Sequence, residues 1–351
     1  MIHLTSRTGT RRSALLAIAF IGLAVAGCGS SAGSGSPASS GSSPSPSPSR
    51  ANTNIPAATA NVAYAASLAF LNEKIVGPAF EQADLLKYSG RAGPSDGLSK
   101  EIASGEITPD VFESVGGDPI AALEPKFTKW YVQYAATSIV LAYNPASKYA
   151  KQFKAIGNGT EPVKNLFSIL QQPGFKLGRT DPNLDPQGRA FIYMLELAQM
   201  KYHLPAGTVT KILGSPLASA SASEIFDEAA LEPRLQAGQL DASSAYLSQA
   251  IQLHLHYIKL PAAINLGDAA LAAQYGKASI TITGNVTKHG SPLVIDITAI
   301  NNSQAGAKFV SYVLSPAGLA LHKQGGYTLL KPTLTGDASA VPPSVRGELG
   351  G

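Results

Sequence analysis

The sequence predicts an α/β protein of two lobes, each a mostly parallel sheet flanked by helices. Apolar strand-like runs alternate with segments of helical periodicity along the chain, and this alternation is typical of βαβ units. About 290 residues follow a low-complexity segment near the N-terminus, which is enough for two lobes rather than one small domain. Residues 175–201 contain a short strand-like segment, then a turn, then a long segment of helical periodicity.

Residues 1–28 have the pattern of a lipoprotein signal peptide. Three arginines precede an apolar run at residues 14–26, which is too short to span a bilayer as a mature helix but suits a signal peptide. The run ends in Val-Ala-Gly-Cys, which resembles the bacterial lipobox, so Cys28 is the predicted lipidation site. A plain signal peptide with an incidental cysteine is the alternative. Cys28 is the single cysteine, so no disulfide is available to the chain.

Residues 29–56 are mostly Ser, Pro, Gly and Ala. Such a segment cannot bury enough apolar surface to offset its chain entropy, so we expect a disordered linker. The net charge of +4 includes the basic signal region, and no Lys/Arg cluster with interleaved aromatic residues is present, so we expect no nucleic-acid partner. We expect a monomer anchored by lipid to the extracytoplasmic face of the cell membrane.

In the first half of the folded body, the strands and helices follow from residue type and spacing. Residues 61–64 read as a strand, and residues 68–82 carry helical periodicity. Residues 130–134 and 138–143 are two apolar strand-like runs in tandem. A short strand at 175–178 then leads into the turn before a helix at residues 189–201.

The second half contains fewer clear signals. Residues 242–246 read as a short strand. Two strand-like runs at 278–283 and 293–298 flank a turn containing Gly, Asn and Pro, and this pattern predicts a hairpin. Residues 305–315 read as an amphipathic helix, followed by a Pro/Gly break and a second helix. Residues 336–351 are expected to be a flexible tail.

The turn before the long helix is a candidate anion site. Pro186 stands where a first helical turn would start, and Asp185 just before it is a favoured N-cap residue. The backbone N–H groups of Gln187 and Gly188 then lack partners within the helix, and the helix dipole favours negative charge at that end.

The same turn resembles a family signature. Residues 178–188, Gly-Arg-Thr-Asp-Pro-Asn-Leu-Asp-Pro-Gln-Gly, closely resemble the signature of the molybdate/tungstate-binding proteins of the archaeal tungstate-receptor type. Residues 130–143, 235–241 and 257–266 resemble further motifs of that family, and residues 305–326 resemble the ending of many type II solute-binding proteins. The resemblance implies a type II periplasmic-binding fold, no enzymatic activity, no cofactor, and an ABC permease as partner.

The resemblance also implies where the lobes divide. Lobe 1 would comprise residues 57–140 and 265–335, and lobe 2 residues 141–264, with two hinge crossings near Leu141 and Ile264. The ligand would lie between the lobes, at the carboxyl ends of the strands. That ligand would be a tetrahedral oxyanion, molybdate or tungstate, and no metal would bind as a free cation.

Five residues are implied as oxyanion-binding. The hydroxyls of Ser67 and Ser95 would donate hydrogen bonds to the anion from lobe 1. The backbone N–H of Gln187 and the hydroxyl of Tyr246 would donate from lobe 2. A donor-only site suits an unprotonated dianion. Asp185 would either cap its own helix or contact the metal of the bound anion.

Two departures from the archaeal signature are visible. Ala245 stands where archaeal members have a glutamate before the tyrosine, and Gln187 replaces their cysteine. The first departure favours tetrahedral over six-coordinate binding. A receptor for sulfate or phosphate, or a lipoprotein that kept the fold and lost the ligand, remains an alternative. Residues 93–97 also match the Gly-x-Ser-x-Gly of serine hydrolases, but the preceding segment is polar and contains Gly, which disfavours that interpretation.

Overall fold

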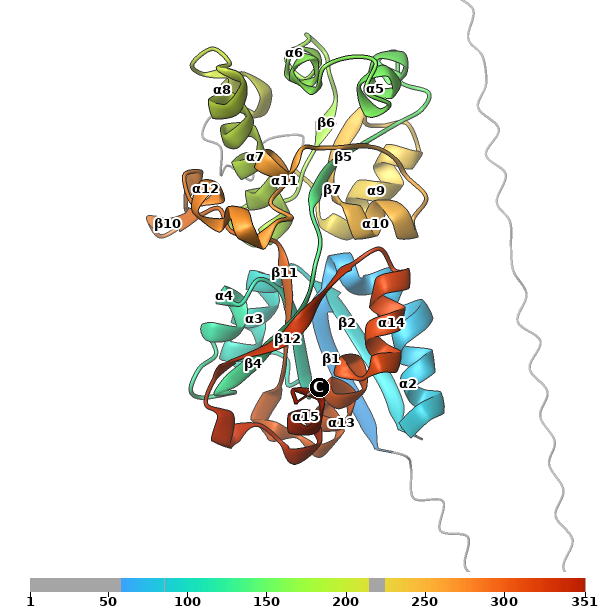
Figure 1. Ribbon diagram of the computed structural model, residues 1–351, viewed down its shortest axis with the longest axis vertical. Coiled ribbons are helices and arrows are strands. Elements are labelled where there is room, and N and C mark those ends of the chain that lie inside the picture. Colours follow the sequence, from blue (N-terminus) through green and yellow to red (C-terminus); the bar gives the residue numbers. More distant parts are fainter. Residues whose placement is uncertain (1–57, 85, 215–224, 351) are drawn as a thin grey trace, which may run out of the picture. The chain divides into compact units, whose positions relative to one another are not determined.

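The computed structural model describes residues 58–84, 86–214 and 225–350 (Figure 1). The predicted signal peptide, Cys28 and the whole of the predicted linker lie outside the described residues. Residues 55–351 form one compact unit. Within the described part of this unit, no helix is both long and apolar enough to cross a bilayer.

The larger sheet has six strands in the order β12-β4-β11-β3-β1-β2. Strand β1 pairs in parallel with β2 and β3, whereas β11 is antiparallel to β3 and β4, and β12 is antiparallel to β4. The strands are β1 (Thr59–Ala65), β2 (Lys87–Gly93), β3 (Val111–Val115), β4 (Trp130–Ala136), β11 (Val294–Ala299) and β12 (Thr328–Gly336).

The smaller sheet has four strands in the order β6-β7-β5-β8. Its strands are β5 (Ile139–Tyr143), β6 (Leu177–Gly178), β7 (Ala242–Tyr246) and β8 (His256–Lys259). Strand β6 is parallel to β7, while β5 is antiparallel to β7 and β8. The α/β class is therefore confirmed, but both sheets are mixed rather than mostly parallel. In the larger sheet, β11 and β12 run opposite to the other strands, and in the smaller sheet β5 is antiparallel to both of its neighbours.

Helices cover both faces of the larger sheet. Successive side chains of β1 point to opposite faces and pack with different helices. Val62 and Tyr64 pack with α2 (Gly77–Asp84) and α13 (Gln304–Leu314), whereas Ala63 packs with α3 (Ser95–Ser104) and α4 (Asp118–Ala121). The predicted helix at 68–82 is interrupted: the 3₁₀ turn η1 (Ala66–Leu68), α1 (Ala69–Leu71) and the π turn η2 (Asn72–Val76) precede α2. The predicted pair of C-terminal helices is confirmed as α13 and α14 (Pro316–Gln324).

The smaller sheet is also covered on both faces. Helix α7 (Pro186–Tyr202) packs against β5 and β7, and α9 (Glu228–Gln236) with α10 (Leu247–Gln252) covers the opposite face. Further helical segments are α5 (Ala150–Gly157), η3 (Val163–Asn165), α6 (Leu166–Ile169), α8 (Thr208–Leu213), α11 (Ala262–Asn265), η4 (Ala269–Leu271) and α12 (Ala272–Tyr275).

The predicted hairpin is wrong in its second strand. Strand β9 (Ser279–Ile282) pairs with β10 (Val286–His289), while the run at 293–298 becomes β11 of the larger sheet. Three residues, 283–285, connect the two strands, and Gly284 and Asn285 both have positive φ, 82° and 60°, a conformation that Gly and Asn adopt more readily than other residues. Strand β10 is mostly exposed and polar, so it carried no strand signal of its own.

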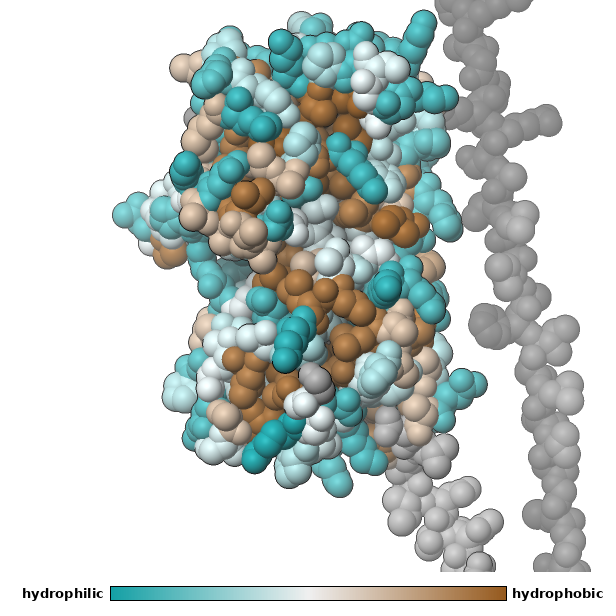
Figure 2. Space-filling view, viewed as in Figure 1, coloured by the Kyte–Doolittle hydropathy of each residue, from teal (hydrophilic) through white to brown (hydrophobic). Residues whose placement is uncertain are grey.

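Strand β12 lies at the edge of the larger sheet, and apolar side chains gather over it on the face drawn in Figure 2. Lys331 and Pro332 stand in its middle, where the register shifts between Leu329 and Thr333. A charge, a proline and an irregular register all oppose pairing of an edge strand with another chain.

The chain passes from the larger to the smaller sheet between β4 and β5. After β8 it leaves the smaller sheet, forms the separate two-stranded sheet of β9 and β10, and re-enters the larger sheet at β11. The division into two lobes with hinges near Leu141 and Ile264 stays a prediction. The structure differs from the expected flexible tail, because residues 336–351 contain a 3₁₀ turn, η6 (Ala338–Ala340), and a helix, α15 (Pro343–Glu348). Val345 is fully buried in the same hydrophobic core as the apolar side chains of α13.

Candidate functional site

Helix α7 begins as the sequence predicts. Asp185 is its N-cap, and the Asp185 Oδ1 atom accepts a hydrogen bond of 2.8 Å from the backbone N–H of Gln187. That N–H, which we expected to face the anion, is therefore already paired. The other carboxylate oxygen, Oδ2, is buried without a hydrogen-bond partner. Burial raises the pKa of Asp185 to about 6, although the Gln187 N–H and the Arg189 charge oppose this shift.

Two of the predicted hydroxyl donors are buried and unpaired. Ser67 follows β1 in the turn η1, and Tyr246 is the last residue of β7. Both side chains are nearly inaccessible, and neither Ser67 Oγ nor Tyr246 Oη has a hydrogen-bond partner. Because most buried polar groups are hydrogen-bonded, unpaired hydroxyls suggest a place for a ligand.

A buried amide network surrounds these hydroxyls. Gln187 Nε2 donates to Gln249 Oε1 at 2.8 Å and to Glu228 Oε1 at 3.0 Å. Gln249 Nε2 donates to the same Glu228 oxygen at 2.6 Å. Ser67 lies beside this network, because the turn η1 contacts both α9 and α10. We call this group the Glu228 cluster: Ser67, Asp185, Gln187, Glu228, Tyr246 and Gln249.

Glu228 and its neighbour Glu232 are site residues that sequence reasoning missed. Both are buried on α9. Burial and the charges of Asp185 and Glu232 raise the pKa of Glu228 well above its usual range, and burial raises the pKa of Glu232 to about 7. In the sequence these residues have the spacing of an ordinary solvated helix face. The sequence signal that could have identified them is their position directly before residues 235–241, which resemble a motif of the family.

A cavity of about 290 Å³ opens beside the cluster, between η1 and α1 on one side and α9 and α10 on the other. Ser67, Glu228, Glu232 and Gln249 contribute to its wall. Part of the cluster is therefore accessible from a crevice between elements of the two sheets.

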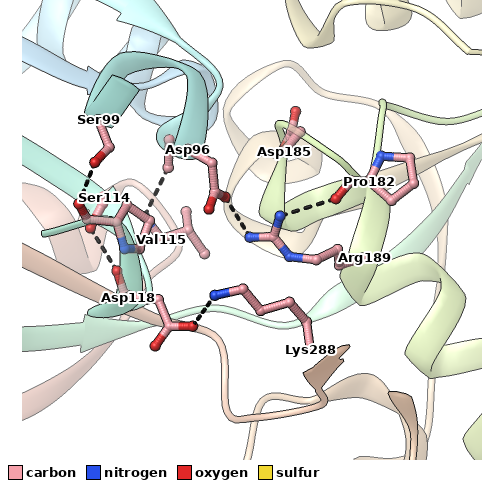
Figure 3. Close-up of polar contacts among 12 residues, drawn as sticks. Asp96, Ser99, Ser114, Val115, Asp118, Pro182, Asp185, Arg189 and Lys288 are labelled. Atoms are coloured by element: carbon pink, nitrogen blue, oxygen red, sulfur yellow. Dashed lines mark hydrogen bonds and ion pairs between the residues drawn. The ribbon is translucent and has the colours of Figure 1, made fainter. Parts of the chain in front are cut away.

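Ser95 lies apart from the cluster at the start of α3. Its Oγ accepts a hydrogen bond of 3.3 Å from the backbone N–H of Val115, which leaves the hydroxyl hydrogen able to donate. The next residue, Asp96, joins α7 through an ion pair of 2.5 Å with Arg189 (Figure 3). The structure thus brings four of the five predicted residues around Glu228, and links Ser95 to them through Asp96 and Arg189.

A larger cavity of about 630 Å³ lies beside the Asp96–Arg189 pair. Its wall includes Arg189, Asp118 and Lys288, and the last two form an ion pair of 2.6 Å (Figure 3). None of the five predicted site residues lines this cavity. Among the described residues, no group of three or more His, Cys, Asp or Glu side chains is arranged to hold a metal cation.

Residues 60–328 match the family of bacterial extracellular solute-binding proteins. The chain belongs to that family. The predicted family is confirmed, and with it an extracellular class of solute-binding transport protein.

Two relatives show which solute-binding proteins this chain is similar to. The molybdate/tungstate-binding protein WtpA of Thermococcus kodakarensis is 29% identical over 245 residues, which are 64% of this chain and 67% of that protein. A solute-binding protein of Petrotoga mobilis is 30% identical over 216 residues. That match covers 59% of this chain and 64% of the Petrotoga protein, just under two thirds of its length.

A solved structure supports the fold. The periplasmic molybdate-binding protein of Azotobacter vinelandii superposes with a TM-score of 0.52, covering 77% of this chain and 99% of that chain. The identity is 17%, so the likeness concerns the fold alone. The predicted type II periplasmic-binding fold is confirmed.

Proposed function

We propose that this solute-binding protein captures a tetrahedral oxyanion, molybdate or tungstate, outside the cell and delivers it to an ABC importer. The observation that carries the proposal is the pair of buried, unpaired hydroxyls on Ser67 and Tyr246, which come from elements of different sheets. The relative from Thermococcus kodakarensis, named for molybdate and tungstate, supports the same ligand class.

The chemistry of the donors suits an unprotonated dianion. Each hydroxyl donates one hydrogen bond, and the Ser95 hydroxyl keeps a hydrogen that can be donated. Such anions are bound by converging N–H and O–H groups without a paired counter-charge. Asp185 then serves as the helix cap rather than as a ligand, in line with its hydrogen bond to Gln187. The buried methyl group of Ala245 offers no carboxylate for a wider coordination shell.

The proposal includes closure of two lobes over the anion. Residues 57–140 with 265–335 would form one lobe and residues 141–264 the other. The Asp96–Arg189 pair, whose side chains are largely buried, would hold the closed form. Closure would present a composite surface to the permease. Cys28 and the linker at residues 29–56 would anchor the monomer to the membrane.

A second ligand class is favoured by one observation. The unpaired Asp185 Oδ2 is an acceptor, and an acceptor suits an oxyanion that still carries a proton, such as hydrogen phosphate. Sulfate, like molybdate, carries no proton at neutral pH and would need only donors. The unpaired carboxylate oxygen therefore makes phosphate the main competing ligand.

Calorimetric titration of the unlipidated protein with molybdate, tungstate, sulfate and phosphate tests the proposal. We expect molybdate or tungstate to bind most tightly and to raise the melting temperature, because a ligand that binds only the folded state stabilises it by mass action. If phosphate binds most tightly, the ligand is phosphate rather than molybdate or tungstate. Absence of binding by all four anions would reject the receptor function.

A further inference from the structure

The β9–β10 hairpin is fastened to the smaller-sheet body, by which we mean the four-stranded sheet with its covering helices (Figure 1). The backbone N–H of Ser279 donates to Glu196 Oε2 on α7 at 2.8 Å. At the hairpin tip, the backbone N–H and the hydroxyl of Thr283 each donate to Asn183 Oδ1 at 2.9 Å. Asn183 belongs to the turn before α7, so neutral hydrogen bonds and one to a carboxylate join the hairpin to this body.

The two segments that cross between this body and the larger-sheet body, the six-stranded sheet with its helices, lie side by side. The backbone N–H of Thr137, between β4 and β5, donates to the carbonyl of Leu293 at 2.9 Å, and the Leu293 N–H donates to the carbonyl of Leu266 at 2.8 Å. After Leu266 the chain turns back to the smaller-sheet body, where α12 contacts α11 and α11 contacts α7. The chain therefore returns to the larger sheet through residues 290–293, after the hairpin, and not near Ile264.

An ion pair joins the hairpin to the larger-sheet body. Lys288 Nζ on β10 lies 2.6 Å from Asp118 Oδ2 at the start of α4 (Figure 3). Both residues line the cavity of about 630 Å³, whose wall combines α7 and the hairpin with residues of the larger sheet. Within the described part of the chain, no other residue of the hairpin forms an ion pair. The Lys288–Asp118 pair thus spans the crevice between the two bodies.

The exposure of this ion pair suits a contact that forms and breaks. The accessible fraction is 71% for the Asp118 side chain and 25% for that of Lys288. Exposed pairs contribute little to stability, because water solvates the two charges once they separate. The backbone of Lys288 stays paired with Ile280 of β9. Separation of the two bodies would therefore break the ion pair and leave the hairpin intact.

We propose that the β9–β10 hairpin is a clasp: it moves with the smaller-sheet body, and Lys288 fastens it to Asp118 when the two bodies close over a ligand. The inference rests on the oxyanion function and the closure proposed above, and it moves the second hinge to residues 290–293. A contact present only in the closed form stabilises that form and slows release of the ligand. Lys288 thus lengthens the residence time of the anion without touching it.

Release kinetics test the clasp. In full-length protein carrying Cys28→Ser, bound molybdate is chased with excess tungstate and the molybdenum retained by the protein is followed. Lys288→Met should release molybdate about two- to fivefold faster, the range for an exposed ion pair, and the difference should shrink as salt screens the pair. The matched control is Lys277→Met, because Lys277 is exposed just before β9 and forms no ion pair with the described residues. Equal release rates for the two variants would overturn the proposal.

Distances between spin labels test which body carries the hairpin. Labels at Val286→Cys on β10 and Lys151→Cys on α5 should keep their distance when molybdate is added. Labels at Val286→Cys and Lys100→Cys on α3 should approach each other. The three side chains are exposed, and Cys28→Ser removes the single native cysteine. The opposite pattern would show that the hairpin moves with the larger-sheet body, and two unchanged distances in protein that binds molybdate would show no closure; either result overturns the proposal.

The labels also separate failure of the clasp from failure of the proposed function. If calorimetry detects no binding of any oxyanion, the receptor function fails, while the labelled ligand-free protein still tests the hairpin. Lys288→Met should then broaden the distance distribution between Val286→Cys and Lys100→Cys, and leave that between Val286→Cys and Lys151→Cys unchanged. Identical distributions with and without Lys288→Met would overturn the clasp.

Discussion

At the scale of single residues, Asp185 has a local role and a tertiary one. Its Oδ1 atom caps α7, as an Asp-Pro pair at a helix start predicts. Its Oδ2 atom is buried and unpaired because elements distant in sequence, including α9 and β7, enclose it. The cap could be predicted from neighbouring residues, but the environment of the second oxygen depended on the packing of the whole site.

The hydroxyls of Ser67 and Tyr246 are predicted to contribute more to anion binding than Asp185 does. Ser67→Ala and Tyr246→Phe each remove one hydrogen bond to a dianion, so each should weaken molybdate binding by about 1.5–3 kcal/mol, roughly ten- to a hundredfold. Calorimetric titration of each variant measures the loss.

Asp185→Asn is the comparison for those two variants. Asparagine caps a helix nearly as well as aspartate, so this change should weaken binding only slightly. A loss larger than those of both hydroxyl variants would mean that the Asp185 carboxylate contacts the ligand, and the donor-only description of the site would have to be abandoned.

Asp296 is predicted to make folding stability depend on pH. It lies fully buried on β11, and neither carboxyl oxygen has a hydrogen-bond partner. Burial raises the pKa of Asp296 to about 7, whereas the unfolded value is about 3.9. The folded state therefore keeps a proton that the unfolded state releases, so the stability is complete below about pH 4 and is lost as pH rises toward 7.

Asp296→Asn removes this titration. Between about pH 4 and 7, the free energy of unfolding of the variant should fall less steeply than that of wild type, by up to about 1.4 kcal/mol per pH unit. Urea unfolding across this range measures both slopes. Parallel curves for the two proteins would show that Asp296 titrates normally in the folded state.

At the scale of elements, the turn before α7 explains why a glycine follows Asp185-Pro186-Gln187. A Cβ atom on Gly188 would overlap the carbonyl oxygen of Thr180 and lie 2.9 Å from the backbone nitrogen of Pro182. The turn therefore folds back onto the first turn of the helix, with no space for a side chain. The sequence predicted a helix start here, but the close backbone approach became visible only in the folded turn.

Gly188→Ala is therefore predicted to destabilise the protein by about 1–3 kcal/mol, since the clash is with backbone atoms that cannot rotate away. The matched control is Gly97→Ala on α3, where the nearest atom to a new Cβ lies at an ordinary 3.6 Å. That change should be neutral or slightly stabilising, because alanine favours the helix. Thermal unfolding of both variants compares them, and equal melting temperatures would contradict the explanation.

At the scale of the whole molecule, elements of different sheets are linked by side chains far apart in sequence. Asp96 and Arg189 pair from α3 and α7, and Lys288 on β10, a strand of the two-stranded sheet, pairs with Asp118 on α4. The Lys288–Asp118 pair is exposed, with 71% of the Asp118 side chain accessible, so it contributes little to stability. The Asp96–Arg189 pair is largely buried, so removal of either side chain would leave an uncompensated charge and destabilise the protein.

The predicted membrane anchor also belongs to this scale. Cys28→Ser removes the thiol that would receive the lipid, so the protein should leave the membrane fraction and accumulate in the soluble extracytoplasmic fraction. Fractionation followed by detection of the protein measures the shift. Protein that remains processed and membrane-bound would exclude lipidation at Cys28.

The sequence by itself determined the features that depend on near neighbours or on a shared motif. These were the α/β class, the cap of α7, the tandem strands β4 and β5, and the family to which the chain belongs. Hydrophobic periodicity and capping chemistry act over a few residues, so they can be read directly from the chain.

Only the tertiary structure decided which strands pair and which polar groups meet. The hairpin partner of β9, the mixed strand directions and the buried position of Val345 all depend on contacts between distant segments. Glu228 is the most consequential case, because in the sequence it is an ordinary charged residue of a helix. It became central once α7, α9, α10 and the turn after β1 were packed together, and burial then changed its chemistry by removing the water that stabilises a charge.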